Sequence, residues 1–422
     1  MRRALDLELS PGPVLPLGFL LAAPWFGVAA GLVLAWYGGE ALASRWNGAT
    51  LALVHLLTLG FLTMTMAGSL LQMLPVVAGL PLRRTAWARW SCPLLGAGAL
   101  LLALAFATGA AVLFAAAAGT LAAAFALLLA CLLPSLWQRG SAFPAAVAGI
   151  VGGMRSATGM LAAAVCAGLA LAAWLAGGRA LPAVRLTDAL AALGLGGWVV
   201  LLVVAVSFQV LPMFQGTSPY PPRLVRWLAP GLALALAAWT AARWFEAGWR
   251  GWAAAALAAG AALWIAASWR LLARRRRTPD PTTAHWRLAL ASLAAAASAF
   301  AWPGQLPEAV TLFAGVAFLG GFAMTLVDGM LFKIVPFLLW YHMQERAQPG
   351  TRIPKTAELA PAPRIRVQFH CHAGAVALAM LACRWPVLAR AAGLLLAADC
   401  LLLALCLGWP LLRHRRLLRQ PS

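Results

Sequence analysis

The sequence predicts an all-α polytopic membrane protein, with about 12 transmembrane helices in three pseudo-threefold four-helix repeats. Three observations lead to this fold class. The 422-residue chain is 63% hydrophobic and only 10% charged, apolar runs recur from about residue 14 to residue 412, and one short motif appears three times. Because so much apolar surface requires lipid as its solvent, we expect a single transmembrane domain over residues 1–422, with the lipid bilayer as its main partner.

Each predicted span is a run of roughly 20 mostly apolar residues, the length that a helix needs to cross the hydrocarbon core. The break between the third and fourth spans rests on the turn signal Ala107-Thr108-Gly109. The spans are residues 14–36, 50–79, 88–108, 110–135, 154–176, 189–214, 225–243, 251–272, 285–302, 310–341, 370–389 and 391–412. They group into repeats at about 14–135, 154–272 and 285–412.

The distribution of basic residues predicts the topology. With the amino terminus inside, 24 of the 32 Lys and Arg residues fall on the cytoplasmic side and seven fall outside, while Lys333 lies within a span. Cytoplasmic loops carry such an excess, so both termini are predicted to be cytoplasmic. The start of the chain, with Arg2 and Arg3, lacks the pattern of a cleaved signal peptide. Dispersed arginines also argue against nucleic acid as a partner.

A motif of Gln or Lys followed three positions later by Pro marks three spans that lie four spans apart. The proline removes a backbone donor near the end of a helix, and the glycines before it allow neighbouring helices to approach closely. Three helices of this kind that run in the same direction indicate three equivalent four-helix units. The motifs are Gln72/Pro75, Gln209/Pro212 and Lys333/Pro336, preceded by Gly60, Gly197 and Gly321 at fifteen positions and by Gly68, Ala205 and Gly329 at seven.

This architecture resembles the catalytic subunit of heme-copper oxidases, the cytochrome c oxidase subunit I-like superfamily, and its diverged relatives. The strings HLLTLGFLTMTMAGSLLQMLP, VSFQVLPMFQGTSPYPP and GMLFKIVPFLLWYHMQ are also similar to uncharacterised bacterial membrane proteins of that superfamily. The resemblance implies the bacterial cytoplasmic (inner) membrane and a respiratory-chain or metal-handling partner. It also implies an axial ligand of heme b, or a copper ligand, at His55 in the second span. A histidine hydrogen-bonded to a neighbouring helix is the alternative.

The chain departs from that family where oxygen is reduced. The family holds copper and its second heme with histidines on the sixth, seventh and tenth helices. Here the sixth span carries Asp188 and Gln209, the seventh has no histidine, and the tenth has only His342 near its cytoplasmic end. The sequence therefore argues against oxygen or nitric oxide reduction and assigns no catalytic residue.

A second candidate metal site lies at the predicted cytoplasmic boundary. His342 closes the tenth predicted span, and His370-Cys371-His372 opens the eleventh. Histidines at this spacing can bind copper or zinc if a fourth ligand joins them. Solvated histidines in a basic loop are the alternative.

Polar residues within the spans form the last candidate set: Gln72, Gln209, Asp328 and Lys333, with Asp399 in the twelfth span. Ionisable groups are costly at this depth in a membrane, so we treat each of them as a candidate functional residue. Asp328 and Lys333 are five residues apart, about 140° around an ideal helix, so we expect no direct pair between them. Hydrogen bonding at a proline-broken helix end and a polar ligand or proton path are both open interpretations.

The leading hypothesis is a heme-copper oxidase-like membrane protein that holds a single heme or copper in a redox, sensing or accessory role, without the binuclear centre. The alternative is a transporter or channel for a metal ion or small solute, which would use the intramembrane polar residues. An accessory protein without a site of its own is a third hypothesis.

Overall fold

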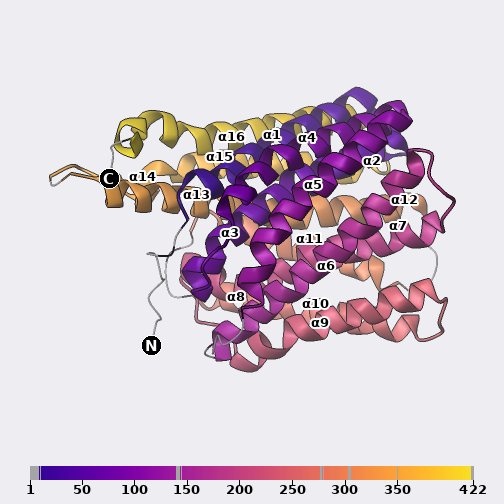
Figure 1. Cartoon of the computed structure of the whole chain (residues 1–422), viewed down its shortest axis with the longest axis horizontal. Helices are drawn as coiled ribbons and strands as arrows, with labels where there is room; N and C mark the ends of the chain where they lie inside the picture. Colours follow the sequence, from indigo (N-terminus) through magenta and orange to yellow (C-terminus); the bar gives the residue numbers. More distant parts are fainter. Residues whose placement is uncertain are drawn as a thin grey trace. The chain divides into compact units, whose positions relative to one another are not determined.

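A computed structural model of the chain describes residues 9, 11–138, 143, 145–275, 278, 280–302, 306–348 and 350–419. All regular elements of these residues are helical, as Figure 1 shows. Eleven helices in the described part are long and apolar enough to cross a membrane, so the chain is an all-α, multi-pass membrane protein. The amino-terminal tail with Arg2 and Arg3, and also Arg139, Arg276 and Arg277, lie outside the described residues.

The elements follow one another as long helices joined by short connections. In chain order they are α1 (Val14–Tyr37), η2 (Gly38–Leu42), α2 (Gly48–His55), η3 (Leu56–Thr63), α3 (Met64–Ala78), α4 (Thr85–Thr108), α5 (Ala111–Leu136), α6 (Ala145–Leu175), α7 (Ala183–Ala191), η4 (Ala192–Val200), α8 (Leu201–Gln215), α9 (Pro222–Trp244), α10 (Arg250–Ala273), α11 (Thr283–Phe300), α12 (Glu308–Val316), η5 (Ala317–Met324), α13 (Thr325–Arg346), α14 (Thr356–Leu359), α15 (Ala362–Ala382), η6 (Pro386–Leu388) and α16 (Ala389–Arg419).

The predicted spans differ from the observed helices in several bounds; the span at 154–176, for example, is α6 at Ala145–Leu175. Two further differences concern α11 and α15. The span at 285–302 is the helix α11, which is not among the eleven apolar ones because His285 and Arg287 make its first turns polar. The bounds predicted as 370–389 are wrong, since α15 covers Ala362–Ala382. Pro363 in its first turn favours a helix start, and the charged residues that follow lower the hydropathy without breaking the helix. His370 and His372 therefore lie well inside α15.

The chain forms two compact units. The first, which we call the α4–α10 unit, contains Leu70–Thr278 and Ala294–Pro307 together with Met1–Pro11. Within it, Trp264 donates to Ser207 at 3.0 Å, and the hydroxyls of Tyr220 and Ser268 lie 2.7 Å apart. These hydrogen bonds satisfy polar side chains between α8, α10 and the start of α9. Burying these side chains without hydrogen bonds would be costly.

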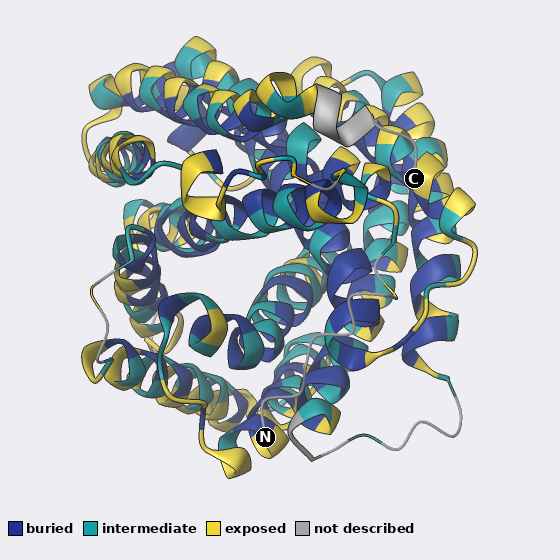
Figure 2. Cartoon of the chain, turned by 90° about the vertical axis from the view of Figure 1, so that its left-hand side faces the viewer, coloured by how far each residue is buried: buried dark blue, intermediate teal, exposed yellow. Residues whose placement is uncertain are grey.

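The second unit contains Gly12–Ser69, Pro279–Leu293 and Glu308–Ser422, and we call it the α1–α16 unit. In it, α1 and α16 run side by side, as Figure 1 shows. They meet backbone to backbone, because a Cβ built on Gly31 would lie 2.7 Å from the carbonyl oxygen of Gly393, and one built on Gly393 would lie 2.7 Å from that of Gly31. Figure 2 shows the result of such packing, with buried residues on one side of a helix and exposed residues on another.

Three long helices contain π-helical segments at matching positions. The segments η3, η4 and η5 end at Thr63, Val200 and Met324, each twelve residues before Pro75, Pro212 and Pro336 respectively. Each segment also contains one of the three glycines at the fixed offset, namely Gly60, Gly197 and Gly321. Because π-helical turns are rare and are frequent at functional sites, their repetition at one register is a specific feature of this chain.

The same helices pack against the preceding helix of their own unit in one pattern. A Cβ built on Gly60 would lie 2.6 Å from that of Phe26, one on Gly197 2.5 Å from that of Met160, and one on Gly321 2.5 Å from Ser292 Oγ. Eight residues further along, the contacts are Gly68 with Phe19, Ala205 with Gly153 and Gly329 with His285. On the preceding helices the partners are seven residues apart each time. The predicted close approach at these glycines is confirmed.

Candidate functional site

Three membrane-spanning helices of the α1–α16 unit bring their polar residues to one place. On α13, Thr325 and Asp328 share a face because they are three residues apart, and on α15 the same holds for Gln368 and His372, four residues apart. Asp399 approaches from α16. All five residues are buried. Together with His285 of α11 they form what we call the His372 cluster.

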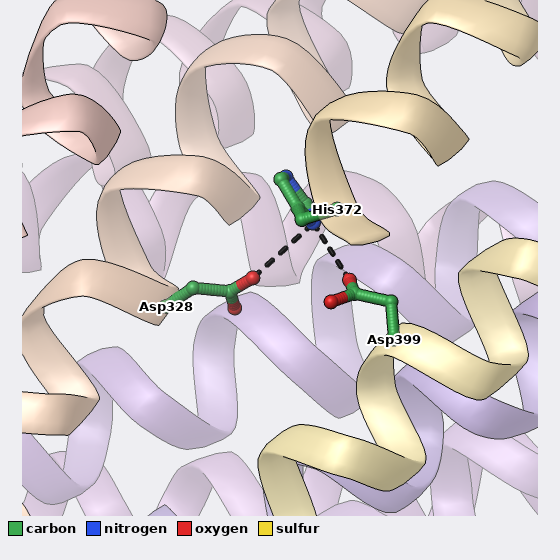
Figure 3. Close-up of side chains that lie close together, drawn as sticks. All are labelled: Asp328, His372 and Asp399. Carbon is green, nitrogen blue, oxygen red and sulfur yellow. Dashed lines mark hydrogen bonds and ion pairs between the residues drawn. The ribbon is translucent and has the colours of Figure 1, made fainter. Parts of the chain in front are cut away.

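Two carboxylates share one imidazole nitrogen at the centre of this cluster. His372 Nδ1 lies 2.7 Å from Asp399 Oδ2 and 3.2 Å from Asp328 Oδ2, and all three side chains have no exposed surface. Figure 3 shows the two carboxylates meeting the ring from different helices. Among the described residues this is the one group of three His, Cys, Asp or Glu side chains whose ligand atoms lie close enough to hold a metal ion.

The other ring nitrogen of His372 is held by the π-helical segment. The Thr325 hydroxyl donates to the carbonyl oxygen of Gly320 at 2.9 Å, and the same hydroxyl oxygen lies 2.9 Å from His372 Nε2. Because the hydroxyl proton is already used, Nε2 carries a proton and donates it to Thr325. Gly320 lies in η5. This backbone irregularity therefore orients the ring so that Nδ1 faces the carboxylates.

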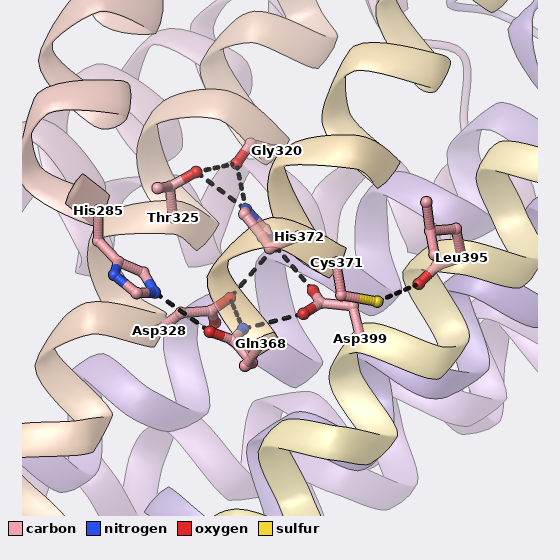
Figure 4. A network of polar contacts seen from close by, with 9 residues as sticks. All are labelled: His285, Gly320, Thr325, Asp328, Gln368, Cys371, His372, Leu395 and Asp399. Carbon is pink, nitrogen blue, oxygen red and sulfur yellow. Dashed lines mark hydrogen bonds and ion pairs between the residues drawn. The ribbon is translucent and has the colours of Figure 1, made fainter. Parts of the chain in front are cut away.

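Gln368 joins the two carboxylates from a third direction. Its side-chain nitrogen donates to Asp328 Oδ2 at 2.8 Å and to Asp399 Oδ1 at 2.9 Å, so both amide hydrogens are used. Its oxygen accepts a hydrogen bond from His285 Nε2 at 3.1 Å. Figure 4 shows this network from His285 through Gln368 to the carboxylates. The amide therefore fixes the spacing of the two carboxylates.

Two buried atoms of the cluster have no hydrogen-bond partner in the described part of the chain: Asp328 Oδ1 and His285 Nδ1. Buried polar atoms in folded proteins are nearly always satisfied, and an exception calls for an unseen water, ion or functional role. The charges are also unequal, since one imidazolium can neutralise only one of two carboxylates. Burial of the remaining negative charge is costly unless a cation or a proton joins it.

Lys333 lies on the same helix as Asp328 but pairs elsewhere. Its Nζ is 2.5 Å from Asp280 Oδ2, and both side chains are partly exposed. Asp328 and Lys333 thus have different partners, Asp328 with His372 and Gln368 and Lys333 with Asp280. Burial raises the pKa of Asp280, but hydrogen bonds from Lys333 and Thr282 and the Lys333 charge outweigh it and hold the pKa below its usual value.

The structure separates the other residues proposed from sequence. His370 is exposed, and its Nδ1 donates to the Arg366 carbonyl oxygen at 2.7 Å. His342 is buried on α13, with Nδ1 2.9 Å from Glu345 Oε2. Neither joins His372 in a group at ligand spacing.

The remaining candidates lie on the helices that carry the π segments. His55 ends α2, and its Nδ1 lies 2.7 Å from the Leu51 carbonyl oxygen. Gln72 is buried on α3, and Gln209 is half-buried on α8. Both glutamines belong to the α4–α10 unit.

Sequence reasoning missed the partners of Asp328. Asp399 had no predicted partner, and Gln368 and Thr325 had no predicted role. The available signal was the spacing of Gln368 and His372, which places both on one helical face, but the span that was predicted to begin at residue 370 excluded Gln368. No family model matches the chain, and a search of curated proteins finds no match.

Proposed function

We propose that this protein is a membrane transporter or channel for a cation, and that the cation binds between Asp328, Asp399 and His372. The observation that carries the proposal is the pair of fully buried carboxylates on one imidazole, within helices that can cross a membrane. Intramembrane ionisable residues that face other helices commonly mark ion or proton pathways. Selection for stability alone does not account for two such carboxylates, since an apolar contact would serve as well.

The repeat supports a transport function and is itself part of the proposal. We propose three equivalent four-helix units around a pseudo-threefold axis, about twelve spans in all, with α11 as the least apolar of them. The matching π-helical segments and the matching glycine contacts support this arrangement. Interrupted helices beside polar residues are a common device of transporters, because irregular backbone is tolerated at membrane depth where it lines a site.

Flux measurements on proteoliposomes test the transport proposal. We expect the wild-type protein to carry Mn²⁺, Zn²⁺ or H⁺, followed with an internal dye, and Asp399→Asn to reduce the rate at least tenfold because the site loses a negative charge. His370→Gln, on an exposed side chain of α15, is the matched control and should keep the wild-type rate. Wild-type flux no faster than that of protein-free liposomes for every cation tested would overturn the proposal.

We propose as a second candidate the heme-copper oxidase-like role, with a single heme b or copper at His55. The hydrogen bond from His55 Nδ1 to the Leu51 carbonyl oxygen favours it, because metal-bound histidines usually donate one ring nitrogen to such a group. His55 lies twenty residues before Pro75, whereas His342, the single histidine of 308–346, lies six residues after Pro336. When the two helices are aligned on these prolines, His55 and His342 lie at different levels. A heme at His55 would therefore receive one histidine ligand, and not two, from these two helices.

An optical spectrum and an iron and copper analysis of the purified protein test this second role. A Soret band that is lost in His55→Ala would support it. A preparation without a Soret band, iron or copper would eliminate it, and leaves the cation proposal untouched.

A further inference from the structure

The donor atoms of the His372 cluster define the kind of cation that fits. They are one imidazole nitrogen and carboxylate oxygens, all fully buried. Imidazole with carboxylate suits divalent first-row metals such as Mn²⁺, Fe²⁺ and Zn²⁺, whereas Cu(I) prefers thiolate and thioether ligands. Cys371 and Cys400 adjoin His372 and Asp399 in sequence but are not part of the group at ligand spacing.

The charge of the cluster matches a divalent ion. A neutral His372 with two carboxylates carries a charge of −2, which one M²⁺ cancels. An ion bound to His372 Nδ1 takes the place of the proton on that nitrogen, so a monovalent ion there would leave one negative charge without compensation in a fully buried site, which is unfavourable. For an ion bound through Nδ1, the burial of the cluster therefore favours a charge of +2.

The separations of the two carboxylates from His372 Nδ1 are close to those between neighbouring ligands of an assembled site. Metal–ligand bonds of about 2.1 Å place neighbouring ligand atoms about 3.0–3.4 Å apart. The observed separations from His372 Nδ1 are 2.7 and 3.2 Å, so only a small expansion admits an ion. Asp328 Oδ1 is also buried and has no hydrogen-bond partner in the described chain, so it is available as an additional ligand.

A second layer of contacts holds each ligand in place. His372 Nε2 donates to Thr325 and lies 3.3 Å from the Gly320 carbonyl oxygen, which directs Nδ1 toward the two carboxylates. Gln368 binds both carboxylates. Metal-bound histidines almost always donate their second ring nitrogen in this way, and ligating carboxylates are themselves hydrogen-bonded.

We propose that the cation is a divalent first-row transition-metal ion, coordinated by His372 Nδ1 and by the carboxylates of Asp328 and Asp399. This proposal names the substrate class of the transport function proposed above and rests on it for its physiological meaning. Metal binding itself is independent of transport and can be measured without a membrane gradient.

Equilibrium binding of Mn²⁺ and Zn²⁺ to the purified full-length protein in detergent tests the site. We expect one ion per chain and a rise in Tm with metal, because an ion that binds only the folded state stabilises it. Thr325→Val keeps the size of the side chain and removes the hydroxyl that orients His372, so it should weaken binding by about 10–100-fold. X-ray absorption of the bound metal should show nitrogen and oxygen ligands without sulfur.

The variants separate the outcomes. His370→Ala, on the exposed side of α15, should bind as the wild type does, and Asp328→Asn should lose at least tenfold in affinity. Binding that is unchanged in both Thr325→Val and Asp328→Asn, or a sulfur-ligated ion, would overturn the metal assignment. A protein that transports H⁺ or Na⁺ yet binds neither metal would also overturn it. A protein that binds metal at this site without flux overturns only the transport proposal.

Discussion

His372→Leu is expected to lower the free energy of unfolding by about 3–5 kcal/mol, because it leaves two buried carboxylates without their shared cation. The leucine fills much of the ring volume, so the loss reflects charge and hydrogen bonding more than a cavity. His372 has no exposed surface and contacts Asp328, Asp399 and Thr325. Thermal or denaturant unfolding in detergent, followed by circular dichroism, measures the effect.

His370→Leu is the matched control for this variant. It makes the same substitution two residues away on α15, where the side chain is exposed and Nδ1 donates to a carbonyl of its own helix. Adding Asp399→Asn to His372→Leu should recover part of the stability, since one unpaired charge is removed, and this non-additivity measures the coupling. Equal unfolding temperatures for His372→Leu and His370→Leu would contradict the role given to the cluster.

Gly31→Val is expected to destabilise the α1–α16 unit by about 3 kcal/mol, at the upper end of overpacking effects. Its Cβ would lie 2.7 Å from the Gly393 carbonyl oxygen and 2.8 Å from Ala397 Cα, both of which are backbone atoms that no rotamer change can move. The helices must separate, and small residues at such crossings allow the close packing that drives association in lipid. A lower unfolding temperature in detergent is the measurement.

Gly18→Val tests whether this effect arises from the crossing. It places the same residue in the same helix, at an exposed position with no atom within 4 Å of the built Cβ. Both variants add a β-branched residue to α1, so their intrinsic helix propensities cancel in the comparison. Similar losses in the two variants would mean that the α1–α16 crossing does not determine stability.

Helix boundaries were predictable where a local signal marks them. Gly109 ends α4 with a φ of 71°, a conformation that glycine adopts readily, and the turn expected at Ala107-Thr108-Gly109 is confirmed there. The start of α15 was not predictable from hydropathy, since its first two turns carry Arg364 and Arg366. Because the predicted span began at residue 370, His370 and His372 were expected at its end, whereas they lie well inside α15.

The candidate site was predictable as residue types but not as a set of partners. Asp328, Lys333 and His372 stand out in sequence because ionisable residues are costly within apolar spans. Their partners are distant in the sequence. His372 and Asp399 are separated by 27 residues, and Lys333 and Asp280 by 53. A pattern that repeats every few residues carries no information on which helices lie side by side.

The sequence by itself determined the all-helical membrane class, most of the helix positions and the three glycine–proline motifs. These follow from the free energy of transferring each segment to lipid and from backbone chemistry at Gly and Pro, which are local properties. Only the tertiary structure decided that His372 lies between Asp328 and Asp399, that Lys333 pairs with Asp280, and that the glycines meet side chains of a preceding helix. Those choices depend on helix packing, which is set by complementary shape and charge over the whole unit.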